Sequence, residues 1–362
     1  MITKEEAVVI WLDLFEGVTI KRKYEILNSY KNAEYLFLGF KNDFSKFDSF
    51  LDANLFSKMS YALDLDFLNK QVIEYERMKV SVITYNSKNY PKTLKQIATP
   101  PLVLYCRGDV SLLQNECFSV VGTRRATRYG KRMTEKFATA LSNAGFTIVS
   151  GLADGIDTES HRATLSAGGK TIAVLGGGVF EIYPQSNIAL ANEIIEKGLL
   201  ISEYKPYDKP VNFHFPIRNR IIAGLSCGVL IPEAGLKSGS MHTKEYALEE
   251  NRDLFVIPGN IDSTESAGCN EIIKHLQGTC VTTPDDILAF YHKTRVNVTD
   301  KPQHLQLTIE EKLIIDILKV DEVHYDELVE KTKLDTKTLN SLLTVMQVRG
   351  IIKKLPGNLY SI

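Results

Sequence analysis

The spacing of hydrophobic residues changes along the chain, and each spacing predicts a different kind of domain. From Lys4 to about Asn69, apolar positions such as Ala7 and Trp11 recur every three or four residues. This is the spacing of helices that bury one face. Two short β-type runs, VSVITY and PLVLY, follow between Val80 and Asp109. The pattern therefore predicts a small helical domain followed by a part of the chain that begins with strands.

From Cys117 onward, short apolar runs alternate with stretches of helical length. The helical stretches include residues 129–144 and 187–196, and the runs are FSVVG, FTIVSG, TIAVLGGG, GLLIS, CGVLIP and DLFVIPG. Such alternation predicts an α/β fold, in which a parallel sheet carries helices on both faces. In this architecture ligands bind in the crevice at the carboxyl ends of the strands. Candidate binding residues are therefore sought directly after each run.

The last part of the chain predicts a winged helix. Residues 293–306 are polar and without apolar periodicity, and we interpret them as a linker. Residues 307–362 contain three helical patterns and two β-type runs with a turn at Pro356-Gly357-Asn358. The third pattern, Thr336–Arg349, would be the recognition helix, but its cations are Lys337 and Arg349 alone. Because phosphate contacts need local positive charge, the pattern favours a surface that meets protein or a second copy of the chain over one that meets duplex DNA.

Composition restricts the class of protein further. The 362 residues carry a formal net charge of -1, so a polyanion would have to be recognised by a local patch. Five scattered cysteines are typical of a reduced, cytoplasmic protein rather than of a disulfide framework or a zinc site. The start of the chain is unlike a signal peptide, and no apolar run approaches the ~20 residues of a membrane span. We expect a soluble cytoplasmic protein without a membrane partner or a bound metal.

The first anion-site candidates follow the run FSVVG. Gly122, Thr123, Arg124 and Arg125 form a turn that opens a helix, where phosphates bind in this architecture. Residues 118–136 hold six basic residues against one acid. A dinucleotide fingerprint would need G-x-G-x-x-G, which is absent here, so no nicotinamide or flavin cofactor is expected. The alternative interpretation is a solvated basic face.

The segment NFHFPIRNRIIAGLS, residues 212–226, combines aromatic rings and guanidinium groups at a predicted helix start. Pro216 suits the first turn of a helix. The face formed by Ile217, Ile221, Ile222 and Leu225 is expected to be buried. Phe213, Phe215, Arg218 and Arg220 would then be placed to hold single-stranded nucleic acid, with phosphates on the cations and bases on the rings. The alternative is a core helix with packed phenylalanines and with arginines that pair with nearby carboxylates.

Two further strand ends supply small residues. Gly151 follows the second run, and Ser238, Gly239 and Ser240 open a helix after the fifth. They can cap a helix or hold a phosphate. Arg124, Gly151, Gly177, Arg218 and Ser240 all fall at one predicted edge of the sheet, which favours a common site. Asp157 and His161 share a helix face, where a helix cap and a hydrogen-bonded histidine are favoured over a metal site.

At these residues the chain resembles the DNA-processing protein A family (DprA, also called Smf). The resemblance covers about Ile83 to Cys280 and rests on VGTRRATRYG, SGLADGIDTESHRATL, TIAVLGGGVFEIYPQSN, FHFPIRNRIIAGLS, EAGLKSGSMHT and FVIPGNIDSTESAGCN. It implies an extended Rossmann-like core, a dimer, single-stranded DNA binding and help in loading a RecA-type recombinase during natural transformation. Phe215, Arg218, Asn219 and Arg220 match the family's FPxRNR segment. Phe180 departs from the family's usual Asp.

The resulting prediction is a non-enzymatic recombination mediator that protects incoming single-stranded DNA. Its predicted domains are a helical, SAM-like domain (1–75), an extended Rossmann-like core (76–292), a linker (293–306) and a winged helix (307–362). The alternative is a nucleotide-processing hydrolase of the lysine-decarboxylase-like Rossmann group, with Glu233 or Glu245 as its catalytic carboxylate. That group's P-G-G-x-G-T-x-x-E motif is absent, and no nucleophile–base pair with specific spacing is present. A winged-helix transcription factor is a third, less favoured interpretation.

Overall fold

The computed structural model describes residues 2–15, 17–294, 308–319, 321–348, 351–355 and 357–361. The chain divides into two compact units on either side of residue 297. The linker predicted over residues 293–306 lies, apart from its first two residues, outside the described residues. So do Arg349 at the end of the predicted recognition helix and Pro356 in the predicted turn.

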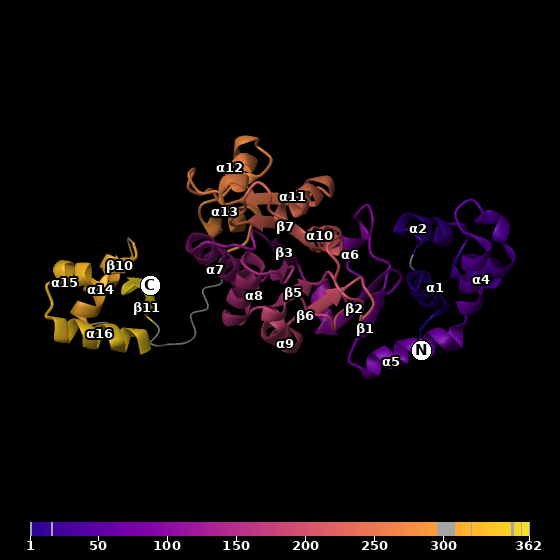
Figure 1. Ribbon diagram of the computed structural model, residues 1–362, viewed down its shortest axis with the longest axis horizontal. Coiled ribbons are helices and arrows are strands. Elements are labelled where there is room, and N and C mark those ends of the chain that lie inside the picture. Colours follow the sequence, from indigo (N-terminus) through magenta and orange to yellow (C-terminus); the bar gives the residue numbers. More distant parts are fainter. Residues whose placement is uncertain are drawn as a thin grey trace. The chain divides into compact units, whose positions relative to one another are not determined.

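Five helices precede the sheet (Figure 1). They are α1 (Lys4–Asp13), α2 (Ile20–Asn28), α3 (Ala33–Gly39), α4 (Ala53–Ala62) and α5 (Leu65–Arg77). Thr3 and Glu6 form a capping box at the start of α1, which satisfies donors that the helix leaves unpaired. Trp11 is fully buried, and its indole N–H donates to the carbonyl of Met59 at 2.7 Å. The predicted helical character of this part of the chain is confirmed.

The apolar side chains of these helices form one hydrophobic cluster with residues of the sheet, among them Val103, Tyr105 and Leu200. Helices α1 and α5 contact the first strands directly. The helical part therefore packs on the edge of the sheet. The boundary placed at residue 75 stays a prediction.

The two β-type runs between Val80 and Asp109 and the six apolar runs from Cys117 onward all become strands of one nine-stranded sheet. Its core strands are parallel: β3 (Cys117–Val120), β4 (Thr147–Ser150), β5 (Thr171–Val174), β6 (Leu199–Ser202), β7 (Ser226–Ile231) and β8 (Asp253–Val256). The spatial order is β1-β2-β6-β5-β4-β3-β7-β8-β9. The order reverses at β3, whose neighbours are β4 and β7, and such a switch point is where open α/β sheets bind ligands.

The sheet is not wholly parallel. The hairpin of β1 (Ser81–Thr84) and β2 (Val103–Gly108) extends it, and β2 pairs antiparallel with β6. A short strand, β9 (Thr279–Cys280), adds to the other edge in parallel. The prediction of a parallel sheet with helices on both faces is thus confirmed for the core. The antiparallel extension was not predicted, because apolar runs do not reveal which neighbour they pair with.

Helices cover both faces of the sheet, as Figure 1 shows. One face packs against α7 (Arg128–Asn143), α8 (Ile156–Ser166), α9 (Ile188–Lys197) and α13 (Pro284–Phe290). The other packs against α6 (Lys92–Lys95), α10 (His214–Leu225), α11 (Ser240–Glu249) and α12 (Ala267–Lys274). Ile221, Ile222 and Leu225 of α10 are buried as predicted, but Ile217 is 40% exposed. The prediction that Ile217 anchors the helix is therefore wrong.

A titratable group lies where α1 meets the sheet. The carboxylate of Asp13 accepts a hydrogen bond from the Tyr105 hydroxyl at 2.9 Å. Burial raises the pKa of Asp13 from 3.8 to about 6, although Lys23 lowers it. Because the pKa rises on folding, the stability from the bound proton is fully present below pH 3.8 and is lost as the pH rises through 6.

We therefore expect Asp13→Asn to raise the free energy of unfolding at pH 8 by up to about 3 kcal/mol and by less at pH 5. Urea melts of the variant and the wild type at both pH values measure this difference. Asp48→Asn, at an exposed position, is the matched control and should change neither melt. A variant whose free energy of unfolding changes equally at both pH values, or falls at pH 8, would contradict the argument.

The second unit has the predicted winged-helix elements. They are α14 (Ile309–Leu318), β10 (Val323–His324), α15 (Tyr325–Thr332), α16 (Thr336–Val348), β11 (Lys353–Leu355) and β12 (Leu359–Ser361). The three strands form one sheet in the order β10-β12-β11, so β10 adds a strand that the sequence did not predict. Gly357 and Asn358 have φ of 83° and 61°, the left-handed region that turn residues of these types favour.

Candidate nucleic-acid interface

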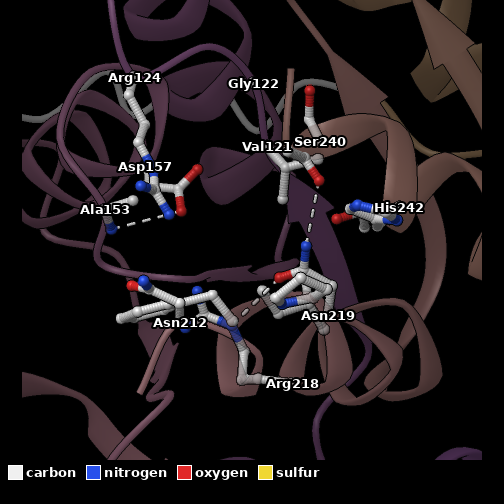
Figure 2. A pocket seen from close by; sticks show the side chains of 15 residues that line it. Val121, Gly122, Arg124, Ala153, Asp157, Asn212, Arg218, Asn219, Ser240 and His242 are labelled. Carbon is white, nitrogen blue, oxygen red and sulfur yellow. Dashed lines mark hydrogen bonds between the residues drawn. The ribbon is translucent and has the colours of Figure 1, made fainter. Parts of the chain in front are cut away.

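A pocket of about 300 Å³ opens at the carboxyl ends of the core strands, where β3 meets α10 and α11 (Figure 2). Seven of the predicted site residues line it: Gly122, Arg124, Phe215, Arg218, Asn219, Gly239 and Ser240. The first and the last of these residues, Gly122 and Ser240, lie more than 100 positions apart in the sequence. The structure thus brings them together at one edge of the sheet.

Two depressions adjoin the pocket. One, of about 40 Å³, is lined by Gly151 and Tyr183, and the other, of about 500 Å³, by Thr123, Arg125 and Ser238. Arg124 lines the pocket and both depressions. The remaining predicted site residues, Phe213 and Arg220, line none of the three, and neither does Gly177.

Arg124 and Phe215 offer a charge and a ring side by side. Arg124 is exposed, and its guanidinium carbon lies 5.5 Å from the centroid of the Phe215 ring. That distance is within the range of a cation–π contact. Tyr183 is 52% exposed, and the centroid of its ring lies 5.6 Å from the centroid of the Phe215 ring. A phosphate can meet the guanidinium while a base stacks on an exposed ring face.

Arg218 lies beneath the pocket floor and not at an open helix end. Only 3% of it is exposed, and its Nη1 donates to the carbonyls of Gly151 and Val174. Its Nε donates to the side-chain oxygen of Asn219 at 3.1 Å. Burial lowers the pKa of Arg218 to about 10, and nearby Asp157 opposes this shift. The expectation of an open Arg218 is therefore wrong, although its positive charge still lies under the pocket.

Arg220 follows the alternative interpretation, in which a helical arginine pairs with a carboxylate. It is 6% exposed and forms a buried ion pair with Glu203. Because Arg220 lies two residues after Arg218, it projects from a different face of α10. The expectation that Arg220 lies open at the end of the helix is therefore wrong.

Asp157 and His161 both have protein partners. The Asp157 carboxylate accepts from the backbone N–H of Gly151 at 3.1 Å and of Ala153 at 3.4 Å, so it orders the loop after β4. Burial raises the pKa of Asp157, while Arg218 lowers it. His161 is fully buried against the Thr171 hydroxyl, at 2.7 Å, and burial lowers its pKa to about 3. The hydrogen-bonded histidine is confirmed, but the α8 cap is Gly155 and not a carboxylate.

Backbone amides at the strand ends are less available than expected. The Gly151 N–H donates to Asp157. In the first turn of α11, the N–H groups of Met241 and His242 donate to the carbonyls of Ser238 and Gly239. The hydroxyls of Ser238 and Ser240 form a hydrogen bond with each other at 2.8 Å. These amides and hydroxyls therefore already have partners within the protein.

The start of α7 is occupied by the protein itself. Glu233 accepts from the backbone N–H and the hydroxyl of Thr127, at 2.8 and 2.6 Å. A side chain at Gly130 would collide with this carboxylate, since its Cβ would lie 2.2 Å from Oε2 of Glu233. The Thr127 amide and hydroxyl are therefore already paired, and the phosphate predicted at this turn would have to be held by Arg124 and Arg125 instead. Glu233 is only 1% exposed, so its position favours a structural over a catalytic role.

The other carboxylate of the hydrolase alternative is placed differently. Glu245 pairs with Lys244 at 2.8 Å and does not line the pocket. Among the described residues, no group of three or more His, Cys, Asp or Glu side chains could hold a metal ion. Within the same part of the chain, every helix is too short or too polar to cross a membrane.

Several residues that line the interface were not among the predicted site residues. Asn212 and His242 line the pocket, and Tyr183 lines the smaller depression. Tyr183 follows the third core strand in GGGVFEIYP, so its position at a strand end was the available signal. Figure 2 shows His242 beside Asn219 and Ser240 at the α11 side of the pocket. Its exposed position on α11 follows only from how that helix docks.

The fold and the pocket define a class: an extended Rossmann-like α/β protein with a positively charged crevice at the strand switch point and a winged helix in a second unit. A family model described as DNA recombination-mediator protein A matches residues 81–292. A model of the DprA winged helix domain matches residues 299–358. The chain belongs to the DprA/Smf family.

Relatives and solved structures agree with this assignment. DNA processing protein DprA of Bacillus subtilis (strain 168) is 39% identical over 235 residues, covering 64% of this chain and 78% of the relative. The Streptococcus pneumoniae protein of the same name is 46% identical over 200 residues, or 55% and 70% of the two chains. Its X-ray structure has a TM-score of 0.68 at 36% identity, covering 80% of this chain and 98% of that one.

A second structure concerns DNA processing protein A from Helicobacter pylori and its single-stranded DNA binding mode. It has a TM-score of 0.54 at 34% identity and covers 59% of this chain and 96% of that chain. In both comparisons, nearly the whole length of the solved structure matches a part of this chain.

Proposed function

We propose that this protein binds single-stranded DNA at the pocket around Arg124 and Phe215 and acts in DNA processing as a binding protein rather than an enzyme. The observation that carries the proposal is the exposed guanidinium of Arg124 at 5.5 Å from the Phe215 ring, at the switch point of the sheet. Membership of a family described as recombination mediators supports it. So does the Helicobacter pylori relative, whose structure concerns single-stranded DNA binding.

The division of labour within the pocket follows from exposure. Arg124, which is exposed, would contact phosphate, and Phe215 would stack on a base. Gly122, Gly151 and Gly239 would let the backbone approach the strand closely. Arg218 would contribute its charge from below and hold the loop after β4. Thr123, Arg125 and Ser238 would contact nucleotides in the larger depression.

We further propose that the protein, as a homodimer, protects incoming single-stranded DNA and helps to load a RecA-type recombinase in natural transformation. The family description as a recombination mediator supports this role. The winged helix would meet protein rather than duplex DNA, because its described helix α16 contains one cation, Lys337.

A salt titration tests the binding proposal. The wild-type protein is expected to bind a single-stranded oligonucleotide more tightly than the duplex of the same sequence, with an affinity that falls as salt rises. Arg124→Ala should weaken single-strand binding and reduce the slope of log K against log salt by about 0.7, the value for one lost phosphate contact. Fluorescence anisotropy measures both quantities.

Lys58→Ala, an exposed position on α4, is the matched control because it removes the same charge far along the chain from the pocket residues. Its slope should equal that of the wild type. A preference for duplex, or an Arg124→Ala slope equal to that of the control, would overturn the assignment. Release of free base from nucleoside monophosphates by the purified wild-type protein would favour the hydrolase alternative instead.

A further inference from the structure

A row of cations runs along the outer face of α7. Arg128, Arg132 and Lys136 recur every four residues and are exposed, and this spacing places them on one side of a helix. Phe137 and Leu141, on the opposite side of α7, are fully buried. We call Arg128, Arg132 and Lys136 the α7 stripe. Nothing in the pocket described above accounts for it.

The stripe continues the positive charge of the pocket. Arg124 lines the pocket and Arg125 lines the adjoining depression, and both are exposed. Thr127 then caps α7, so the stripe begins four residues after Arg124. From Arg128 to Lys136 the helix rises about 12 Å, which is about the length of three stacked nucleotides of one strand.

The charge on this helix is one-sided. The sequence of α7 contains four basic residues and a single acid, Glu135, although the formal net charge of the whole chain is only -1. A local excess of this kind attracts a polyanion more strongly than the whole molecule does. The stripe can hold phosphates by charge, whereas the one ring beside it, half-buried Tyr129, donates its hydroxyl to the carbonyl of Pro258 at 2.6 Å.

We propose that the sugar–phosphate backbone of single-stranded DNA leaving the pocket runs along the α7 stripe. The inference rests on the proposed function, since it extends the strand held at Arg124 and Phe215. The pocket would hold one or a few nucleotides by stacking and charge, and the stripe would hold the flanking phosphates by charge alone. Contacts to phosphate carry no sequence information, so this extension adds affinity and site length without adding base preference.

The test compares two oligonucleotide lengths and two matched double variants. Arg132→Ala/Lys136→Ala removes two cations of the stripe and leaves the pocket intact. With an oligonucleotide of about 20 nucleotides, its slope of log K against log salt should fall by about 1.4, the value for two phosphate contacts. With one of about 3 nucleotides, which is no longer than the pocket holds, its affinity should equal that of the wild type.

Lys58→Ala/Lys70→Ala is the control, because it removes two exposed lysines and changes the net charge equally. Its slope should equal that of the wild type for both lengths. An unchanged slope for the stripe variant with the long oligonucleotide would overturn the inference and leave an acidic protein segment as the occupant. Equal losses in both double variants would also overturn it, as a general effect of charge. Failure of the wild type to bind the short oligonucleotide would instead contradict the pocket itself.

Discussion

Arg218→Ala is expected to lower the free energy of unfolding by about 3–5 kcal/mol, because it removes one partner of a buried charged pair. The guanidinium is 3% exposed and donates to the carbonyls of Gly151 and Val174. Its loss would leave both carbonyls without these donors and the buried Asp157 without its neighbouring positive charge. Thermal or urea unfolding of the purified variant measures the effect.

The loss is also expected to depend on pH. Burial already raises the pKa of Asp157, and Arg218 lowers it, so the pKa should rise further in the variant. A raised folded-state pKa gives stability that is fully present below the unfolded value of 3.8 and is lost as the pH rises through the folded value. The deficit of Arg218→Ala should therefore grow from acidic to neutral pH.

Arg124→Ala is the matched control for stability, because it removes the same charge from the same pocket at an exposed position. Its free energy of unfolding should stay within about 0.5 kcal/mol of the wild type. If the two variants unfold at the same denaturant concentration, Arg218 has no supporting role. The sequence places both arginines in one binding site, but the structure gives them different roles. A substitution of Arg124 tests binding without a change in stability, whereas a substitution of Arg218 changes both.

Phe215→Ala is expected to weaken single-strand binding by about 1–3 kcal/mol, the usual cost of losing one stacked base, without unfolding the protein. The Phe215 ring lines the pocket beside Arg124 and Tyr183, so its removal takes away the central flat surface. Phe215→Trp should restore most of the affinity, since the ring is retained. Fluorescence anisotropy with a short single-stranded oligonucleotide measures the dissociation constants.

Phe213 supplies the matched control within the same segment. It is 65% exposed at the start of α10 and lines neither the pocket nor the adjoining depressions. Phe213→Ala should therefore leave the dissociation constant near that of the wild type. If Phe213→Ala weakens binding as much as Phe215→Ala does, the strand follows the outer surface of α10 and not the pocket.

Local pattern was sufficient for most of the secondary structure, with β10 as an exception. Each apolar run after Cys117 became a strand, and the helical stretch predicted over residues 129–144 became α7 at Arg128–Asn143. Strands and helices follow from the period of apolar side chains, which is a local property. The strand-end rule then placed Arg124, Phe215 and Ser240 at one edge of the sheet, and the pocket contains all three.

Local pattern failed where a side chain had to find a partner that is distant in the sequence. Phe180 illustrates this: it departs from the family's usual Asp, and its ring stacks on Tyr207 at 4.8 Å and under the guanidinium of Arg107 at 4.6 Å. Neither partner is near it in the sequence. An aromatic residue therefore takes a packing role at this position, which no spacing rule could assign.

By itself the sequence determined the elements, the α/β class, the winged helix and the edge of the sheet where binding residues gather, because these depend on periodicity and chain order. Only the tertiary structure decided which charges are free. Glu203 forms an ion pair with Arg220, and the carbonyls of Gly151 and Val174 accept hydrogen bonds from Arg218. Glu233 accepts a hydrogen bond from the backbone N–H of Thr127 at the start of α7. A buried charge must find a partner wherever the fold places one, and those partners lie 17 to 106 residues away. Arg124, by contrast, is exposed, and its guanidinium lies beside the ring of Phe215.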